Sequence, residues 1–190
     1  MAHRKSPARI AKDARIAHFL SRGATQPSAA AAAQGAEKTV PWEVIAELEA
    51  RLVGRVVLPS DPSYNEDRQE SNPAFQSYPE LIVYCVCESD VLECLAVARR
   101  YRLWVAVRSG GHSTAGYSVN SGMVVDVSEM SGVVLDPAGQ RVHVLPGTDF
   151  DHFNGAMNHT GWHVPTGACG SVHVSGFVQG GGYGYTSRAF

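Results

Sequence analysis

Residues 81–113, LIVYCVCESDVLECLAVARRYRLWVAVRSGGHS, decide the fold that we predict for this chain. The stretch opens with an apolar run at residues 81–86, typical of a buried strand, and a second strand is predicted at residues 104–107. Between them lies a predicted helix over residues 90–100, which Ser89 can cap. Its expected core face repeats at helical spacing and comprises Val91, Leu92, Leu95 and Ala98. The pattern predicts a β-α-β unit whose second strand leads into a glycine-rich segment.

Shorter patterns predict the elements before and between these. A helix is expected to start at Pro41 and to stop at Gly54, with a short strand at residues 56–58. The segment 60–79 is polar and contains several prolines, which indicates a loop. Further strands are predicted at residues 123–127, 133–135 and 141–145, the last with one buried face.

One more helix is predicted after these strands. Thr148 and Asp151 form a capping-box-like start. Gly161 is expected to end the helix. Its core side is expected to consist of Phe150, Phe153 and Met157.

Composition restricts the class of protein. A chain of 190 residues corresponds to one domain or two small ones, and an apolar content of 44% is enough for a core. The net charge of −2 provides no basic field for nucleic acid, and no apolar run is long enough to cross a membrane. Residues 1–40 are basic and then alanine-rich, so we expect a disordered tail, with a degenerate export signal as the alternative. The default expectation is a cytoplasmic protein.

The four cysteines fall into two kinds. Cys85, Cys87 and Cys94 lie in apolar surroundings and are expected to be buried thiols, and no disulfide framework is expected in a domain of this size. Cys169 instead lies between Gly167 and Gly170, where bare backbone leaves its sulfur accessible.

The glycine-rich segment 108–113, RSGGHS, has the composition of an anion-binding loop. Two adjacent glycines leave backbone N–H groups uncovered, and successive free N–H groups form a concavity that suits a pyrophosphate. Arg108 and the hydroxyls of Ser109 and Ser113 add donors. The segment is neither a Walker loop nor a Rossmann fingerprint. A simple glycine turn between strands remains the alternative.

A second glycine-rich region, residues 165–184, resembles the first in placing one nucleophilic side chain in bare backbone. His112 belongs to the first region and Cys169 to the second, which suggests a flat or anionic cofactor. Taken alone, each is also compatible with an ordinary loop residue. A metal site was considered for the late histidines, but their spacing matches no known ligand pattern, and none is expected. They are His143, His152, His159, His163 and His173.

Several ordered motifs resemble the FAD-linked oxidases with a PCMH-type, vanillyl-alcohol-oxidase-like FAD-binding domain, in particular their berberine-bridge-enzyme-like branch. These motifs are VRSGGHSTAGY at 107–117, VVDVS at 124–128, PG at 146–147, GWHVPTGAC at 161–169 and GGGYGYTSR at 180–188. The resemblance covers about residues 55–190 and implies an α+β fold with two α/β subdomains. Residues 1–40 would be a tail, 41–75 a lead-in, and 76–190 the N-terminal part of the FAD domain.

The resemblance also implies a cofactor site. In that branch the flavin is often attached twice, and the matching residues are His112, to the flavin 8α carbon, and Cys169, to C6. Residues 108–113 would hold the pyrophosphate, and the second region would line the isoalloxazine and ribityl groups. One departure is Ser175, where the family often has glycine. The implied site comprises Arg108, Ser109, Gly110, Gly111, His112, Ser113, Gly116, Gly167, Cys169, Gly170, Val172 and Gly176.

The implied activity is that of an FAD-dependent oxidase. It would take hydride from an alcohol, sugar or similar small molecule, pass it to a covalently held flavin, and use O2 as acceptor. No residue is assigned as catalytic, and the oligomeric state is left open. The chain stops at Phe190, where the family pattern continues into a substrate domain. We therefore expect an N-terminal part that alone binds FAD weakly or not at all and turns nothing over. The alternative is a non-catalytic flavin- or anion-binding fragment.

Overall fold

The computed structural model describes residues 40–189 of the chain. The expected tail therefore lies outside the described residues, apart from Val40. A boundary between two units of the chain falls after Ala46. Helix α2 (Trp42–Arg51) begins in the first unit, where the N–H groups of Val44 and Ile45 donate to the carbonyl of Pro41. The predicted start of this helix is confirmed.

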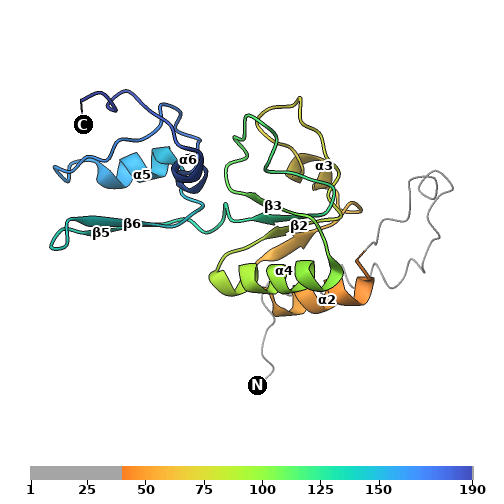
Figure 1. Cartoon of the computed structure of the whole chain (residues 1–190). Helices are drawn as coiled ribbons and strands as arrows, with labels where there is room; N and C mark the ends of the chain where they lie inside the picture. Colours follow the sequence, from red (N-terminus) through yellow and green to blue (C-terminus); the bar gives the residue numbers. More distant parts are fainter. Residues whose placement is uncertain (1–39, 190) are drawn as a thin grey trace, which may run out of the picture. The chain divides into compact units, whose positions relative to one another are not determined.

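A four-stranded sheet forms the core of the second unit (Figure 1). Its strands are β1 (Arg55–Val57), β2 (Leu81–Tyr84), β3 (Val105–Arg108) and β4 (Met123–Asp126), in the order β1-β2-β4-β3. β4 lies between β2 and β3 and runs parallel to both, whereas β1 is antiparallel to β2. Every residue of β2 and β4 is buried, as expected for central strands covered on both faces. The predicted strands are confirmed, with β2 two residues shorter than expected.

Helix α4 (Glu88–Tyr101) connects β2 to β3 along one face of the sheet and confirms the β-α-β unit (Figure 1). The predicted core face is confirmed at Ala98 and wrong at Leu92 and Leu95, which are 66% and 47% exposed. The buried residues of the helix are Asp90, Cys94 and Ala98.

The cause is the Asp90 carboxylate, which fixes how α4 is rotated against the sheet. It accepts hydrogen bonds from the N–H groups of Val53, Gly54 and Val86 at 2.9, 3.1 and 3.0 Å. The cap is also misassigned, since Cys87 rather than Ser89 is the N-cap residue. Burial alone would raise the pKa of Asp90, but the three amides hold it below its ordinary value.

The segment predicted as a loop contains one helical turn, α3 (Tyr64–Asp67). Tyr64 is buried, and its hydroxyl donates to the carbonyl of Pro79 at 2.8 Å. This contact anchors the turn to the chain just before β2, which the polar composition of the segment did not indicate.

A smaller group of elements follows the sheet. Strands β5 (Val133–Asp136) and β6 (Arg141–Val144) form an antiparallel hairpin, and helices α5 (Phe150–Met157) and α6 (Val174–Gly180) follow it. The core side predicted for α5 is confirmed: three buried residues of the helix pack against the apolar residues of the hairpin. They are Phe150, Phe153 and Met157.

Three details around α5 and α6 differ from expectation. The N-cap of α5 is Asp149, whose side chain accepts from the His152 N–H at 2.7 Å, while Thr148 is buried and bonds the backbone of Gly132. α5 ends at Met157, before Gly161. Helix α6 was not predicted, because glycine is unfavourable in helix interiors.

Within residues 40–189, no helix has the length and apolar character that a membrane span requires.

Candidate functional site

Arg108 ends β3 and begins the first glycine loop, residues 108–113. It is paired in register with Asp126 on β4 and is only 5% exposed. Its Nε donates to Asp126 Oδ2 at 2.5 Å, and its Nη2 donates to the Tyr84 hydroxyl at 3.3 Å. Nη1 is buried and has no partner among the described residues. The guanidinium therefore mainly holds the two strand ends together, and only Nη1 is left for a ligand.

The backbone of the same loop offers free donors. Among residues 40–189, the N–H groups of residues 109–113 donate no hydrogen bond. The loop is fixed instead through a carbonyl, since Gly111 O accepts from Ser71 N at 3.0 Å. Gly111 is buried with a φ of +65°, a conformation that side chains rarely adopt. Successive free amides with one unpartnered guanidinium nitrogen beside them fit a pyrophosphate.

A cavity of about 350 Å³ opens beside this loop. Arg108, Ser109, Gly110 and Gly111 line it together with the acidic side chains of α3. Among the latter, Asp67 accepts from the Tyr84 hydroxyl at 2.7 Å.

Burial, together with the hydrogen bond to Asp67, raises the pKa of Tyr84 to about 12, so its hydroxyl remains a donor. Burial raises the pKa of Glu70, which lies behind Gly111.

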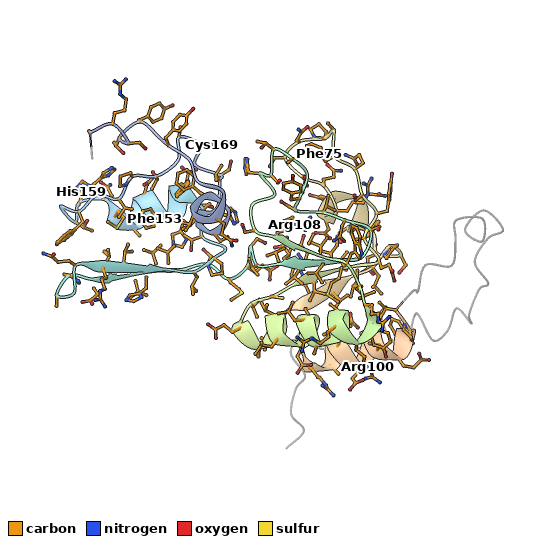
Figure 2. The ribbon with its side chains drawn as sticks, viewed as in Figure 1. Phe75, Arg100, Arg108, Phe153, His159 and Cys169 are labelled. Atoms are coloured by element: carbon orange, nitrogen blue, oxygen red, sulfur yellow. The ribbon has the colours of Figure 1, made fainter. Side chains whose placement is uncertain are left out.

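The second glycine loop brings Cys169 close to His112. Ser171 Oγ lies 3.1 Å from His112 Nε2 and 3.4 Å from Cys169 Sγ. Nε2 and Sγ are therefore no further apart than the sum of these two distances, about 6.5 Å. Cys169 is exposed, and Figure 2 shows it in the loop that precedes α6.

Two further contacts join the loops. The Ser175 hydroxyl, at the position where the family often has glycine, donates to Ser109 Oγ at 3.0 Å. The His173 ring lies directly against Gly110, where an added Cβ would be 2.6 Å from His173 Cδ2. His173 Nδ1 is buried and has no partner in the described part of the chain, and burial lowers the pKa of this imidazole.

The other predicted site residues lie around these loops. Gly116 has a φ of +73° and packs on Phe75, while Gly167 packs on the Phe150 ring. Gly170 lies against the carboxylate of Asp151, and Val172 joins the α5 cluster. Ser113 is occupied locally, because its hydroxyl accepts from the Tyr117 N–H at 3.0 Å.

Gly176 differs from the other glycines of the second loop. An added Cβ there would meet nothing nearer than Ser109 Oγ, at 4.0 Å. Its backbone therefore faces open space on the side of the first loop, as a residue that lines a flat ligand would.

Sequence reasoning missed two residues of the site, Ser171 and His173. Ser171 bonds His112 across 59 positions, so no local spacing could indicate it. His173 had been considered only among possible metal ligands. Within residues 40–189, no group of three or more His, Cys, Asp or Glu side chains could hold a metal ion.

Comparison with known proteins decides the family. The family described as FAD binding domain matches residues 79–190. The chain belongs to this FAD binding domain family. The uncharacterized FAD-linked oxidoreductase YgaK of Bacillus subtilis (strain 168) is 32% identical over 142 residues, which are 74% of this chain and 32% of YgaK. The chain thus spans about a third of the length of this curated relative.

Solved structures of the family agree with the α+β fold. The berberine-bridge-enzyme-like protein BBE-like 1 of Physcomitrella patens has a TM-score of 0.70 and 26% identity, over 76% of this chain and 32% of that protein. A carbohydrate oxidase from Microdochium nivale has a TM-score of 0.68 and 26% identity, over 76% and 31%. The expected likeness to berberine-bridge-enzyme-like FAD-linked oxidoreductases is confirmed.

Proposed function

We propose that this FAD binding domain belongs to an oxidase that takes hydride from an alcohol, sugar or similar small molecule and uses O2 as acceptor. We further propose that His112 and Cys169 hold the flavin covalently. The family and the likeness to a carbohydrate oxidase support the reaction class. When bound, the flavin would supply the hydride acceptor, which no amino-acid side chain provides.

The observation that carries the proposal is the pairing of His112 and Cys169. Two nucleophiles at most about 6.5 Å apart lie beside a loop with free amides. The flavin 8α carbon is the methyl carbon on C8, and C6 and C8 belong to the same six-membered ring, so two side chains that attach at 8α and C6 must be close neighbours. An imidazole and a thiolate are both nucleophiles suited to such bonds.

Each part of the site has a separate task. The free amides of residues 109–113 and Arg108 Nη1 would hold the pyrophosphate, because both present donors without partners. Gly176 would allow the ring to approach the backbone. His112 and Cys169 would fix the position of the ring against the protein, which is the precision that hydride transfer requires.

Flavin attachment is tested on the protein expressed from the complete reading frame that contains this sequence, because this chain alone is expected to bind FAD weakly or not at all. The purified protein is incubated with excess FAD, precipitated with acid, digested, and analysed by mass spectrometry for flavin on the His112 and Cys169 peptides. Reversible binding is expected to be stronger for FAD than for riboflavin, which has no pyrophosphate. Absence of flavin from both peptides would refute covalent attachment.

The reaction is tested on the protein expressed from the complete reading frame that contains this sequence. We expect oxygen consumption with sugars or alcohols, accompanied by bleaching of the flavin absorbance when oxygen is removed. Bound flavin that no member of such a panel reduces would contradict the oxidase.

A non-catalytic anion-binding protein is the second candidate. The free amides and the cavity beside them favour it, because neither requires a flavin ring. ADP separates the two: it contains the pyrophosphate and adenosine but no flavin. Equal affinity for ADP and FAD, with no flavin attached to either peptide, would favour the second candidate.

A further inference from the structure

The Ser171 hydroxyl lies between the two proposed attachment residues. It is 3.1 Å from His112 Nε2 and 3.4 Å from Cys169 Sγ, and both distances are within hydrogen-bonding range. A hydroxyl has one proton to donate and lone pairs to accept, so it can serve both neighbours at once.

The chemistry of the three groups gives these hydrogen bonds a direction. A thiol has a proton to donate, and the Nε2 of a neutral imidazole accepts when the other ring nitrogen carries the proton. In the His112 tautomer with the proton on Nδ1, Ser171 O–H donates to His112 Nε2, and Cys169 S–H then donates to Ser171 Oγ. This is the arrangement of a nucleophile, a relay and a base.

We propose that Ser171 is a positioning residue that passes the proton of the Cys169 thiol to His112 and so prepares Cys169 as a nucleophile. The S–H bond breaks as a new O–H bond forms on Ser171, and the original O–H bond breaks as an N–H bond forms on His112. The products are a thiolate and an imidazolium, and no oxidant is needed. The use of this thiolate for flavin attachment rests on the proposed function.

Surrounding charges act on this transfer. The Asp151 carboxylate lies against Gly170, which follows Cys169 in the chain. His173 lies near His112, and burial lowers the pKa of His173. An uncharged His173 does not repel the positive charge that the proton transfer places on His112. The relay also orders the two attachments, because His112 is not a nucleophile while it holds the proton.

The chain contains its own control. Cys87 Sγ lies 3.0 Å from Ser89 Oγ, a thiol–hydroxyl pair for which no imidazole partner is found within residues 40–189. Cys85 and Cys94 are fully buried, and their mutual hydrogen bond together with burial raises the pKa of the Cys85 thiol. Only Cys169 and Cys87 are therefore expected to react with an external reagent.

The test is alkylation of the whole chain by iodoacetamide at pH 7 without FAD, followed for each cysteine by peptide mass spectrometry. S171A is expected to slow alkylation of Cys169 roughly fivefold to tenfold, because a hydrogen-bonded charge loses its partner. S171T should restore the rate. H112A should slow it similarly, and the double variant S171A/H112A should be no slower than either single variant.

The matched variant is S89A. It should change the rate at Cys87 by much less than S171A changes the rate at Cys169, since no base follows the Ser89 hydroxyl and the Cys87 thiol also hydrogen-bonds the Asp90 carboxylate. Circular dichroism confirms that each variant is folded. The relay is overturned if S171A leaves the alkylation rate of Cys169 at the wild-type value or slows the alkylation of Cys87 equally. It is also overturned if the fold decrease at Cys169 in the double variant is the product of the two single decreases.

A flavin experiment keeps the two proposals distinguishable. With FAD present, S171A should reduce flavin on the Cys169 peptide more than flavin on the His112 peptide. If the wild-type protein from the complete reading frame acquires no flavin, the proposed function fails, while the alkylation rates of the 190-residue chain still decide the relay.

Discussion

Arg108 and Asp126 face each other at the ends of neighbouring parallel strands and form an ion pair that is almost completely removed from solvent. The exposed fractions of their side chains are 5% and 2%. The first glycine loop leaves the sheet at Arg108. The pair therefore fixes the point from which the proposed pyrophosphate loop starts.

Replacing Asp126 with Asn should destabilise the protein strongly, because it leaves the Arg108 charge buried without its counter-ion. A loss of about 3–5 kcal/mol in the free energy of unfolding is expected, measured by urea denaturation. The control is Glu47→Gln, which breaks the exposed pair with Arg51 and should cost about 0.5 kcal/mol or less. Similar losses for both variants would contradict this account.

Asp90 should make the stability of the fold sensitive to acid. Its pKa in the folded state lies below the ordinary value of 3.8, so the folded state binds fewer protons than the unfolded state. The stabilisation by Asp90 is complete at pH values above 3.8, and it is lost as the pH falls through the lowered pKa of the folded state. Asp90→Asn should cost about 2–3 kcal/mol at pH 7 and flatten the loss of stability at acidic pH.

The control for Asp90 is Glu88→Gln, at an exposed position on the same helix. It should leave unchanged both the free energy of unfolding at pH 7 and its decrease at acidic pH. Urea denaturation at several pH values between neutral and acid provides the measurement. An Asp90→Asn variant with the wild-type dependence on acid would show that the three backbone amides do not stabilise the ionised carboxylate.

His173 should produce a second pH dependence, closer to neutrality. Burial lowers its pKa from 6.5, so below that value the unfolded state binds more protons than the folded state. Stability should therefore decrease as the pH falls below 6.5, and His173→Gln should weaken this trend. The change of Tm between pH 7.5 and pH 5 is compared between the wild type and His173→Gln. The control is His143→Asn, at an exposed position, which should show the wild-type change. Equal changes in wild type and His173→Gln would refute the prediction.

Gly176 and Gly155 provide a matched pair for the flavin site. Both are helical glycines, and an added methyl group meets no atom closer than 4.0 Å at Gly176 and none within 4 Å at Gly155. Either change to alanine should maintain or raise stability, by up to about 1 kcal/mol.

Only Gly176→Ala should weaken FAD binding, roughly tenfold, because its methyl group would occupy the space proposed for the ring. Titration of flavin fluorescence compares the two variants. Equal affinities for FAD would remove Gly176 from the site.

The sheet was predictable from sequence because its central strands are continuous apolar runs. The face of α4 was not, since the pattern of Leu92 and Leu95 suggested one orientation and Asp90 imposes another. A buried carboxylate that accepts three amides overrides apolar spacing, and its partners at Val53 and Gly54 are far away in the sequence.

In the site, too, features that depend on local sequence were predictable and features that depend on distant residues were not. The composition of the glycine loops indicated free amides and two accessible nucleophiles, since glycine acts on its own local backbone. Ser171 could not be found in this way, because its role depends on His112, 59 residues earlier. The buried ion pair of Arg108 was equally invisible, as it depends on how β3 and β4 align.

The close approach of the two loops has a thermodynamic consequence. A flavin bonded to both His112 and Cys169 would be a covalent cross-link that closes a loop of about 57 residues, comparable to a long-range disulfide, and by chain-entropy arguments would add about 4 kcal/mol by restricting the unfolded chain. The cofactor would then be a covalent cross-link between the loop that follows β3 and the loop that precedes α6. Loading with flavin would thus increase resistance to unfolding as well as supply a redox group.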